Sequence, residues 1–193
     1  MSSGLLFYWF SWMLWIIIVF MMKKNQMRSY LSFAILIIII SANVILSFQI
    51  YTVSLSYLRL VITAVLWMIQ LQHLAYLLFA SFTLSIGYAG ILLWEKNAPV
   101  WIIMPRVILI SFAIILLIVL CTKYTKERFA ICLTGLTFGE LMYSLTMSSY
   151  GFPEIIGDLQ FFDILLFVIV IILILDILQR GRNKWIYYKK SMH

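Results

Sequence analysis

The side chains of this chain that could do chemistry are a few charged and polar groups inside long apolar stretches. The candidate cluster comprises Glu140, Arg106, Arg59, Asp163 and Asn43. Glu140 lies near the middle of its stretch, and Thr137, Ser144 and Ser148 share its face at helical spacing. A charge at the centre of a bilayer costs roughly 2.5–3.5 kcal/mol, so it usually faces neighbouring helices and has a partner. We therefore predict that Glu140 faces the interior of a helix bundle.

Two interpretations of this cluster are open. In the first, one or two ion pairs lock the bundle, while Arg59 and Asp163 extend outward to the lipid headgroups. In the second, the polar side chains line an outward-open pocket for a proton, an ion or a small ligand. Arg106 is the favoured partner of Glu140, and Arg59 is the second. The reason is that Arg106 lies deeper in its stretch, so its side chain has less chance of reaching the headgroups.

The sequence carries no motif of a familiar catalytic or cofactor site. It lacks H-E-x-x-H, G-x-S-x-G and a phosphate-binding loop. His73 and His193 are its only histidines, and Cys121 and Cys132 have no pair of histidines nearby, so a metal site is not expected. We predict a protein that is not an enzyme and that holds no metal or cofactor.

The composition indicates a membrane protein. Of the 193 residues, 65% are hydrophobic and only 11% are charged, whereas an average soluble domain is about 25% charged. The apolar stretches have the length of transmembrane helices, which need roughly 20 residues each. The expected spans are residues 4–22, 30–50, 54–69, 74–94, 100–121, 129–149 and 161–179. The predicted fold class is all-α: a single polytopic bundle of seven spans over residues 1–193, with a basic tail at 180–193.

The basic residues predict how this bundle is threaded. Residues 60–94 hold no charge and are too long for one span, so the polar segment Gln70–His73 is the expected hinge. The basic loops at 23–28 and 123–128 and the tail then fall on one side, with eleven of the 14 Lys and Arg residues. Because such residues concentrate on the cytoplasmic side, we predict an outside N-terminus and a cytoplasmic C-terminus in a bacterial plasma membrane. The net charge of +7 is then a topology signal, and nucleic acid is not an expected partner.

Small residues form stripes on two of the expected spans. Ser81, Ser85 and Ala89 repeat every fourth residue in the fourth span, and Gly135 and Gly139 do so in the sixth. Such stripes let helix backbones approach closely in lipid. We expect these stripes to pack within one protomer, and a dimer face is the alternative.

The opening segment resembles a known family. Residues Phe7–Trp12 (FYWFSW), followed by an unbroken apolar run into Met22–Lys24, resemble the YphA-type family of small integral membrane proteins from Gram-positive spore-forming bacteria. The total length and the layout of the spans are similar too. The resemblance implies a location in the membrane and supplies no active residues.

Two classes of function follow. The prediction is a non-enzymatic scaffold or modulator of a membrane partner, which fits the absence of motifs and the short loops. The alternative is a small-solute or ion transporter with an outward-facing polar pocket around Glu140. The substrate-binding subunits of energy-coupling-factor vitamin transporters are of similar size, but they carry Ala-x-x-x-Ala in the first helix, where this chain has no alanine. The expected partners are the lipid bilayer and either another membrane protein or a second copy of this chain.

Overall fold

The computed structural model describes residues 4–42, 44–48, 51–97, 105–152 and 154–190. These residues form seven helices and three short strands. The helices are α1 (Leu5–Met21), α2 (Gln26–Ser41), α3 (Leu55–Ile69), α4 (Leu74–Asn97), α5 (Arg106–Cys121), α6 (Thr125–Ser149) and α7 (Leu159–Lys190), and the strands are β1 (Ile45–Phe48), β2 (Tyr51–Ser54) and β3 (Ile155–Ile156).

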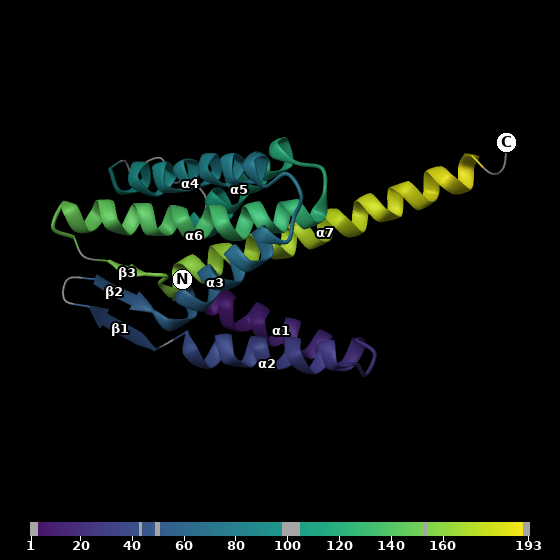
Figure 1. Cartoon of the computed structure of the whole chain (residues 1–193), viewed down its shortest axis with the longest axis horizontal. Coiled ribbons are helices and arrows are strands. Elements are labelled where there is room, and N and C mark those ends of the chain that lie inside the picture. The colour runs from purple at the N-terminus through teal and green to yellow at the C-terminus, as the bar shows by residue number, and fades with distance from the viewer. Residues whose placement is uncertain (1–3, 43, 49–50, 98–104, 153, 191–193) are drawn as a thin grey trace.

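The helices run back and forth between the two ends of an elongated bundle (Figure 1). The central helix is α6, which packs most extensively against α4 and also contacts α3 and α7. Helix α5 lies against α7 and α4, while α1 pairs with α2 and contacts α7. One end holds the three strands, and we call it the strand end. The opposite end holds the α1–α2, α3–α4 and α5–α6 turns, and we call it the basic end because Lys23, Lys24 and Lys123 lie in these turns.

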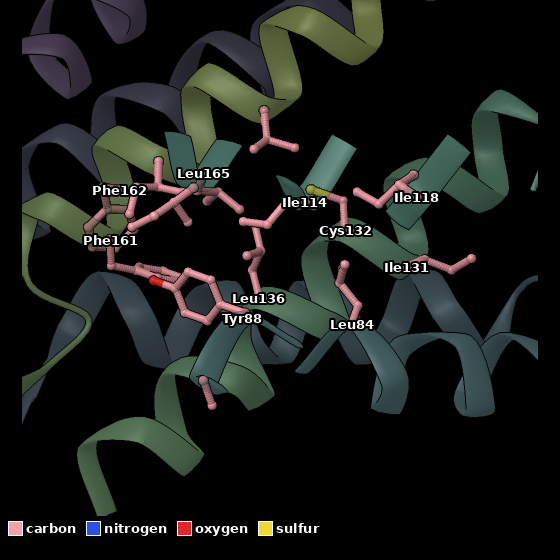
Figure 2. Packing of buried hydrophobic residues seen from close by; sticks show 14 of the residues in the cluster. Leu84, Tyr88, Ile114, Ile118, Ile131, Cys132, Leu136, Phe161, Phe162 and Leu165 are labelled. Carbon is pink, nitrogen blue, oxygen red and sulfur yellow. The ribbon is translucent and has the colours of Figure 1, made fainter. Parts of the chain in front are cut away.

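Apolar side chains fill the core and also cover the outside. Figure 2 shows the core between four helices. Its labelled members come from α4 (Leu84, Tyr88), α5 (Ile114, Ile118), α6 (Ile131, Cys132, Leu136) and α7 (Phe161, Phe162, Leu165). On the outside, Trp9, Phe20 and Phe112 are 73%, 78% and 70% exposed. Helices that are apolar both inside and outside are typical of a bundle that lies in lipid.

The polar segment Gln70–His73 forms the expected turn. Helix α3 ends at Ile69, α4 begins at Leu74, and His73 between them has a left-handed backbone with φ of 61°. The long uncharged stretch is therefore two helices that reverse direction at the basic end (Figure 1).

The fold is mostly helical, as predicted, but a small sheet at the strand end corrects the second predicted span. Helix α2 ends at Ser41, and residues 45–48 of the predicted span 30–50 form β1 instead. This strand pairs antiparallel with β2, and β3 pairs parallel with β2. The sequence from Val44 to Ser54 is rich in β-branched and aromatic residues, which favour strands. Strand pairing then satisfies backbone groups that no longer belong to a helix.

The bounds of α5 and α7 also differ from the prediction. Helix α5 begins at Arg106, directly after Pro105. Proline lacks an N–H group and disfavours a helical conformation of the residue before it, so the helix starts after it. Residues 100–104 of the predicted span lie outside the described residues. Arg106 is therefore the first residue of its helix rather than a residue two turns inside it, and α7 continues through most of the predicted tail to Lys190.

Three helices in the described part of the chain are long and apolar enough to cross a membrane. They are Leu74–Asn97, Thr125–Ser149 and the Leu159–Gln179 portion of α7. The other four apolar helices have 17 residues or fewer, against the roughly 20 residues of a full span. The count of seven spans therefore stays a prediction.

Candidate functional site

The two stripes of small residues lie against each other, and their contact positions the polar groups of the site. Ser85 Oγ donates to the Gly135 carbonyl oxygen at 2.9 Å, and the hydroxyls of Ser81 and Thr134 are 2.7 Å apart. A Cβ at Gly139 would lie 2.9 Å from the Ser85 carbonyl oxygen, so the backbones of α4 and α6 touch there. The buried small residues of the α4 stripe are Ser81, Ser85 and Ala89. Both stripes thus lie in a contact within one protomer.

This contact places Glu140 of α6 opposite Tyr88 of α4. The Tyr88 hydroxyl donates a hydrogen bond to Glu140 Oε2 at 3.0 Å. Glu140 is 6% exposed and Tyr88 is 1% exposed. Glu140 therefore faces the interior of the bundle, nine residues or about 14 Å of helix before the last residue of α6.

Glu140 lies on the wall of a cavity of about 310 Å³ at the strand end. The walls come from α4, α5, α6, α7 and the connection between α6 and α7. Besides Tyr88 and Glu140, the polar lining residues are Lys96, Arg106, Tyr143, Glu154, Asp158 and Gln160. Sites for small molecules usually measure about 300–1,000 Å³. The cavity therefore has room for a small ligand, and its walls offer that ligand charged and hydrogen-bonding groups.

Both basic residues of the cavity wall are in ion pairs. Lys96 Nζ lies 2.5 Å from Glu154 Oε1, which joins the end of α4 to the α6–α7 connection. Arg106 Nε lies 2.9 Å from Glu95 Oε2. Arg106 is thus paired with Glu95 and not with the predicted partner Glu140, although both line the same cavity. The reason is the late start of α5, which places Arg106 at the strand end beside the last residues of α4.

Asp163 neither extends to the headgroups nor lines the cavity, so it has neither of the two roles considered for it. Its carboxylate accepts hydrogen bonds from the backbone N–H groups of Gly4, at 2.9 Å, and Phe7, at 2.6 Å. Asp163 is 5% exposed, so it does not extend to the headgroups. Instead it caps the first turn of α1, whose N–H groups have no partners within the helix.

The other two members of the predicted cluster do not join Glu140. Arg59 Nη1 donates to the Ile37 carbonyl oxygen at 3.3 Å, and Arg59 is not one of the residues that line the cavity. Asn43 lies outside the described residues. Of the predicted cluster, the structure brings together Glu140 and Arg106.

Several residues of the cavity were not predicted from the sequence. Tyr88 follows Ser81 and Ser85 at helical spacing, and this spacing could have identified it as part of the face towards α6. Glu154 and Asp158 belong to the connection between α6 and α7. No local pattern indicates that this connection returns over the end of the bundle.

The cavity is suited to binding polar groups by charge and hydrogen bonds. Within the described residues, no group of three or more His, Cys, Asp or Glu side chains could hold a metal ion. The free thiols Cys121 and Cys132 lie half-buried and buried, and neither lines the cavity. The chemistry of the site is therefore that of its carboxylates, its tyrosines and its two paired cations.

Comparisons with known proteins agree with the apolar bundle. The chain matches the family described as "YphA-like integral membrane protein" over residues 3–193. It is similar to a protein of Bacillus subtilis (strain 168) named "Uncharacterized protein YphA", with 27% identity over 167 residues. The matched region covers 81% of this chain and 79% of that protein. No solved structure gives a significant match. The match over nearly the whole chain shows that this protein belongs to the family of YphA-like integral membrane proteins.

Proposed function

We propose that this integral membrane protein binds a small polar solute in the cavity at its strand end, as a transporter or solute receptor and not as an enzyme. The observation that carries the proposal is Glu140, a buried carboxylate on the wall of a cavity of about 310 Å³. Ionisable residues inside a membrane bundle are costly, and they commonly mark the path or the site of a ligand.

The partners of the charged groups favour binding over a purely structural role. A locking ion pair would join Glu140 to an arginine, but Arg106 is paired with Glu95, and Arg59 donates to a carbonyl oxygen of α2. Glu140 is hydrogen-bonded instead by the neutral hydroxyl of Tyr88. Its charge is therefore available to a solute.

The proposal includes a threading in which all seven helices cross the membrane and the cavity opens to the outside. It is supported by the gathering of Lys23, Lys24 and Lys123 at the basic end (Figure 1), since basic residues concentrate on the cytoplasmic side. The strand end would then face outward, with the N-terminus outside.

A scaffold or modulator of a membrane partner is the second candidate, and one observation favours it. Helix α7 has 32 residues, or about 48 Å of helix, which exceeds a hydrocarbon core of roughly 30 Å. Its C-terminal part projects beyond the bundle at the basic end (Figure 1). A projecting helix of this kind offers a partner a surface that the bundle does not cover.

The test of solute binding is thermal stability of the purified protein in detergent with a set of small solutes: amines, amino acids, sugars, carboxylates and nucleosides. A solute at 100 times its Kd adds about 2.7 kcal/mol, or roughly 5–10 °C of Tm for a chain of this size. We expect at least one solute to raise the Tm of the unmodified protein and not that of Glu140→Gln.

The control is Ser111→Ala, which removes a buried hydroxyl of α5 that does not line the cavity. This variant should respond to the solute as the unmodified protein does. Equal responses of the unmodified protein and Glu140→Gln would place binding elsewhere. Purification with a stoichiometric protein partner, without any solute response, would favour the scaffold.

A further inference from the structure

The charges on the cavity wall do not balance, and the imbalance indicates the class of solute. Three carboxylates line the cavity: Glu140, Glu154 and Asp158. The two basic lining residues each have an acidic partner, Lys96 with Glu154 and Arg106 with Glu95. Among the described residues, Glu140 and Asp158 therefore have no ion pair. The wall is left with unpaired negative charge, which a cation would complement.

The groups nearest the buried carboxylate are neutral donors, and the charge of Arg106 acts on it only through space, since Arg106 is paired directly with Glu95. The Tyr88 hydroxyl donates to Glu140 Oε2 at 3.0 Å, and the backbone of Gly157 lies beside the same carboxylate. Neutral donors orient a carboxylate but leave its charge in place. A hydrogen bond from a charged donor is about twice as strong as one between neutral groups, so a ligand with N–H groups and positive charge fits this position best.

A second polar group points into the same space. The residue Tyr143 is 3% exposed, and its hydroxyl lies towards Glu154 without completing a hydrogen bond. Buried polar groups are nearly always hydrogen-bonded in folded proteins. The Tyr143 hydroxyl is therefore an acceptor or donor that a bound solute can use.

Aromatic rings form much of the remaining wall. Tyr88, Tyr143 and Phe161 line the cavity together with Leu92 and Ile164, and Figure 2 shows Tyr88 and Phe161 at the same end of the core. Aromatic faces attract cations, by about 2 kcal/mol or more where water is excluded. The apolar residues suit a hydrocarbon body attached to the charged group.

We propose that the cavity takes a small organic cation, with a primary or secondary ammonium group at Glu140 and an apolar body against the aromatic wall. This inference rests on the proposed function and names its solute class. An anion would face Glu140 and Asp158 and would have to displace a carboxylate from Lys96 or Arg106. A divalent metal ion would need six or more oxygen ligands, and the described residues bring together no group of three metal-binding side chains.

The test compares three solutes that share one carbon skeleton and differ in charge: isoamylammonium, isoamyl alcohol and isovalerate. The Tm of the full-length protein is measured in detergent and in amine-free phosphate buffer, with sodium chloride at matched concentration as a further arm. Isoamylammonium should raise the Tm saturably, and the other three additions should not.

Three variants tie the response to the site. Glu140→Gln should weaken the apparent affinity for isoamylammonium roughly ten-fold or more, because it removes the charged acceptor. Asp158→Asn, at the more exposed part of the wall, should weaken it about two- to five-fold, and it keeps the test decisive if Glu140→Gln does not fold. Ser111→Ala should leave the affinity unchanged.

Each other result overturns the inference in a distinguishable way. If isovalerate or the alcohol stabilises the protein as much as isoamylammonium does, the preference for a cation is contradicted and the proposal of solute binding stands. If sodium chloride raises the Tm and isoamylammonium adds nothing further, the cavity binds an inorganic ion and the inference is wrong. If neither isoamylammonium nor any other amine gives a response while a sugar, carboxylate or nucleoside of the broader set does, only the cation class fails. If no solute gives one, both proposals fail.

Discussion

Single polar residues in this bundle are used to join helices that lie far apart in the sequence. Asp163 of α7 binds two backbone N–H groups at the start of α1. The Tyr57 hydroxyl of α3 donates to the Thr137 carbonyl oxygen of α6 at 2.6 Å. In lipid, a buried donor or acceptor has no water to bind, so such contacts replace hydration. Glu140 differs from these groups because a cavity lies beside it.

At the residue scale, Gly157 is a backbone position with little freedom. Its φ is +74°, and a Cβ there would lie 2.8 Å from Tyr57 Cγ and 2.9 Å from Ser54 Oγ. Gly157→Ala should cost about 1–2 kcal/mol in backbone strain and about 1–3 kcal/mol in overpacking. The expected result is a clearly lower Tm of the detergent-solubilised protein.

The control for this prediction is Gly151→Ala. Gly151 also has a left-handed backbone, with φ of +83°, but a Cβ there would meet open space. The Gly151→Ala variant should therefore lose only the stability that the backbone strain costs. Equal losses in the two variants would contradict the close contact between the α6–α7 connection and α3.

Burial of the central carboxylate was predictable, but its partner was not. Exposing a lone glutamate of an apolar helix to lipid is costly, so it is expected to face other helices, and Glu140 does so. The partner depended on where α5 begins, because two turns of helix separate the predicted and observed depths of Arg106. The partner of Asp163 depended on α1 ending up beside α7, which no local pattern encodes.

At the scale of elements, the contact between α4 and α6 organises the bundle. It is the most extensive helix–helix contact, and small residues on both helices allow it. Close approach lets the Ser85 hydroxyl reach the Gly135 carbonyl oxygen across the interface. It also fixes the rotation of both helices, so Tyr88 and Glu140 point into the same space.

The prediction for this contact is that Gly139→Leu destabilises the protein more than Leu141→Ala. At Gly139 a Cβ would lie 2.9 Å from the Ser85 carbonyl oxygen and 2.8 Å from Tyr88 Cδ1. A leucine must separate the helices, at a cost of about 1–3 kcal/mol or more. Leu141 is only half-buried at the edge of the core, so its truncation removes fewer contacts. Thermal unfolding in detergent measures both variants, and an equal or larger loss for Leu141→Ala would contradict the role of the glycine.

Helix positions followed from the apolar pattern more reliably than helix ends did. Seven apolar stretches were expected, and each overlaps one of the described helices. The predicted second span ran too far because β-branched residues suit a buried helix in lipid and a strand almost equally, and periodicity does not separate the two. The sheet needs β3, which comes from the connection about 100 residues later, and so it could not be predicted locally.

At the scale of the whole molecule, the two ends of the bundle differ in chemistry. The basic end carries the turns with Lys23, Lys24 and Lys123 and the extension of α7 (Figure 1). The strand end carries the sheet, the cavity and the ion pairs around it. This difference between the ends is typical of a membrane protein, because Lys and Arg residues concentrate in the loops on the cytoplasmic side. The sheet also belongs at an end, since unpaired strand edges are not tolerated within the hydrocarbon region.

The last prediction is the sidedness of these two ends. Reporter domains fused after His73, Pro99 and Arg128 should read cytoplasmic, outside and cytoplasmic. The reporters are one that is active only outside, such as alkaline phosphatase, and one that fluoresces only inside, such as a green fluorescent protein. A fusion after Lys190 serves as the control and should read cytoplasmic.

An outside signal after Arg128 would contradict the seven-span threading, because the α1–α2 and α5–α6 turns would then lie on opposite sides. Cytoplasmic signals at all four positions would mean that α4 does not cross the membrane. The expected pattern would instead place the mouth of the Glu140 cavity outside the cell. A solute could then reach it without entering the cytoplasm, and isoamylammonium should protect a cysteine introduced at Asp158 from a membrane-impermeant thiol reagent in intact cells.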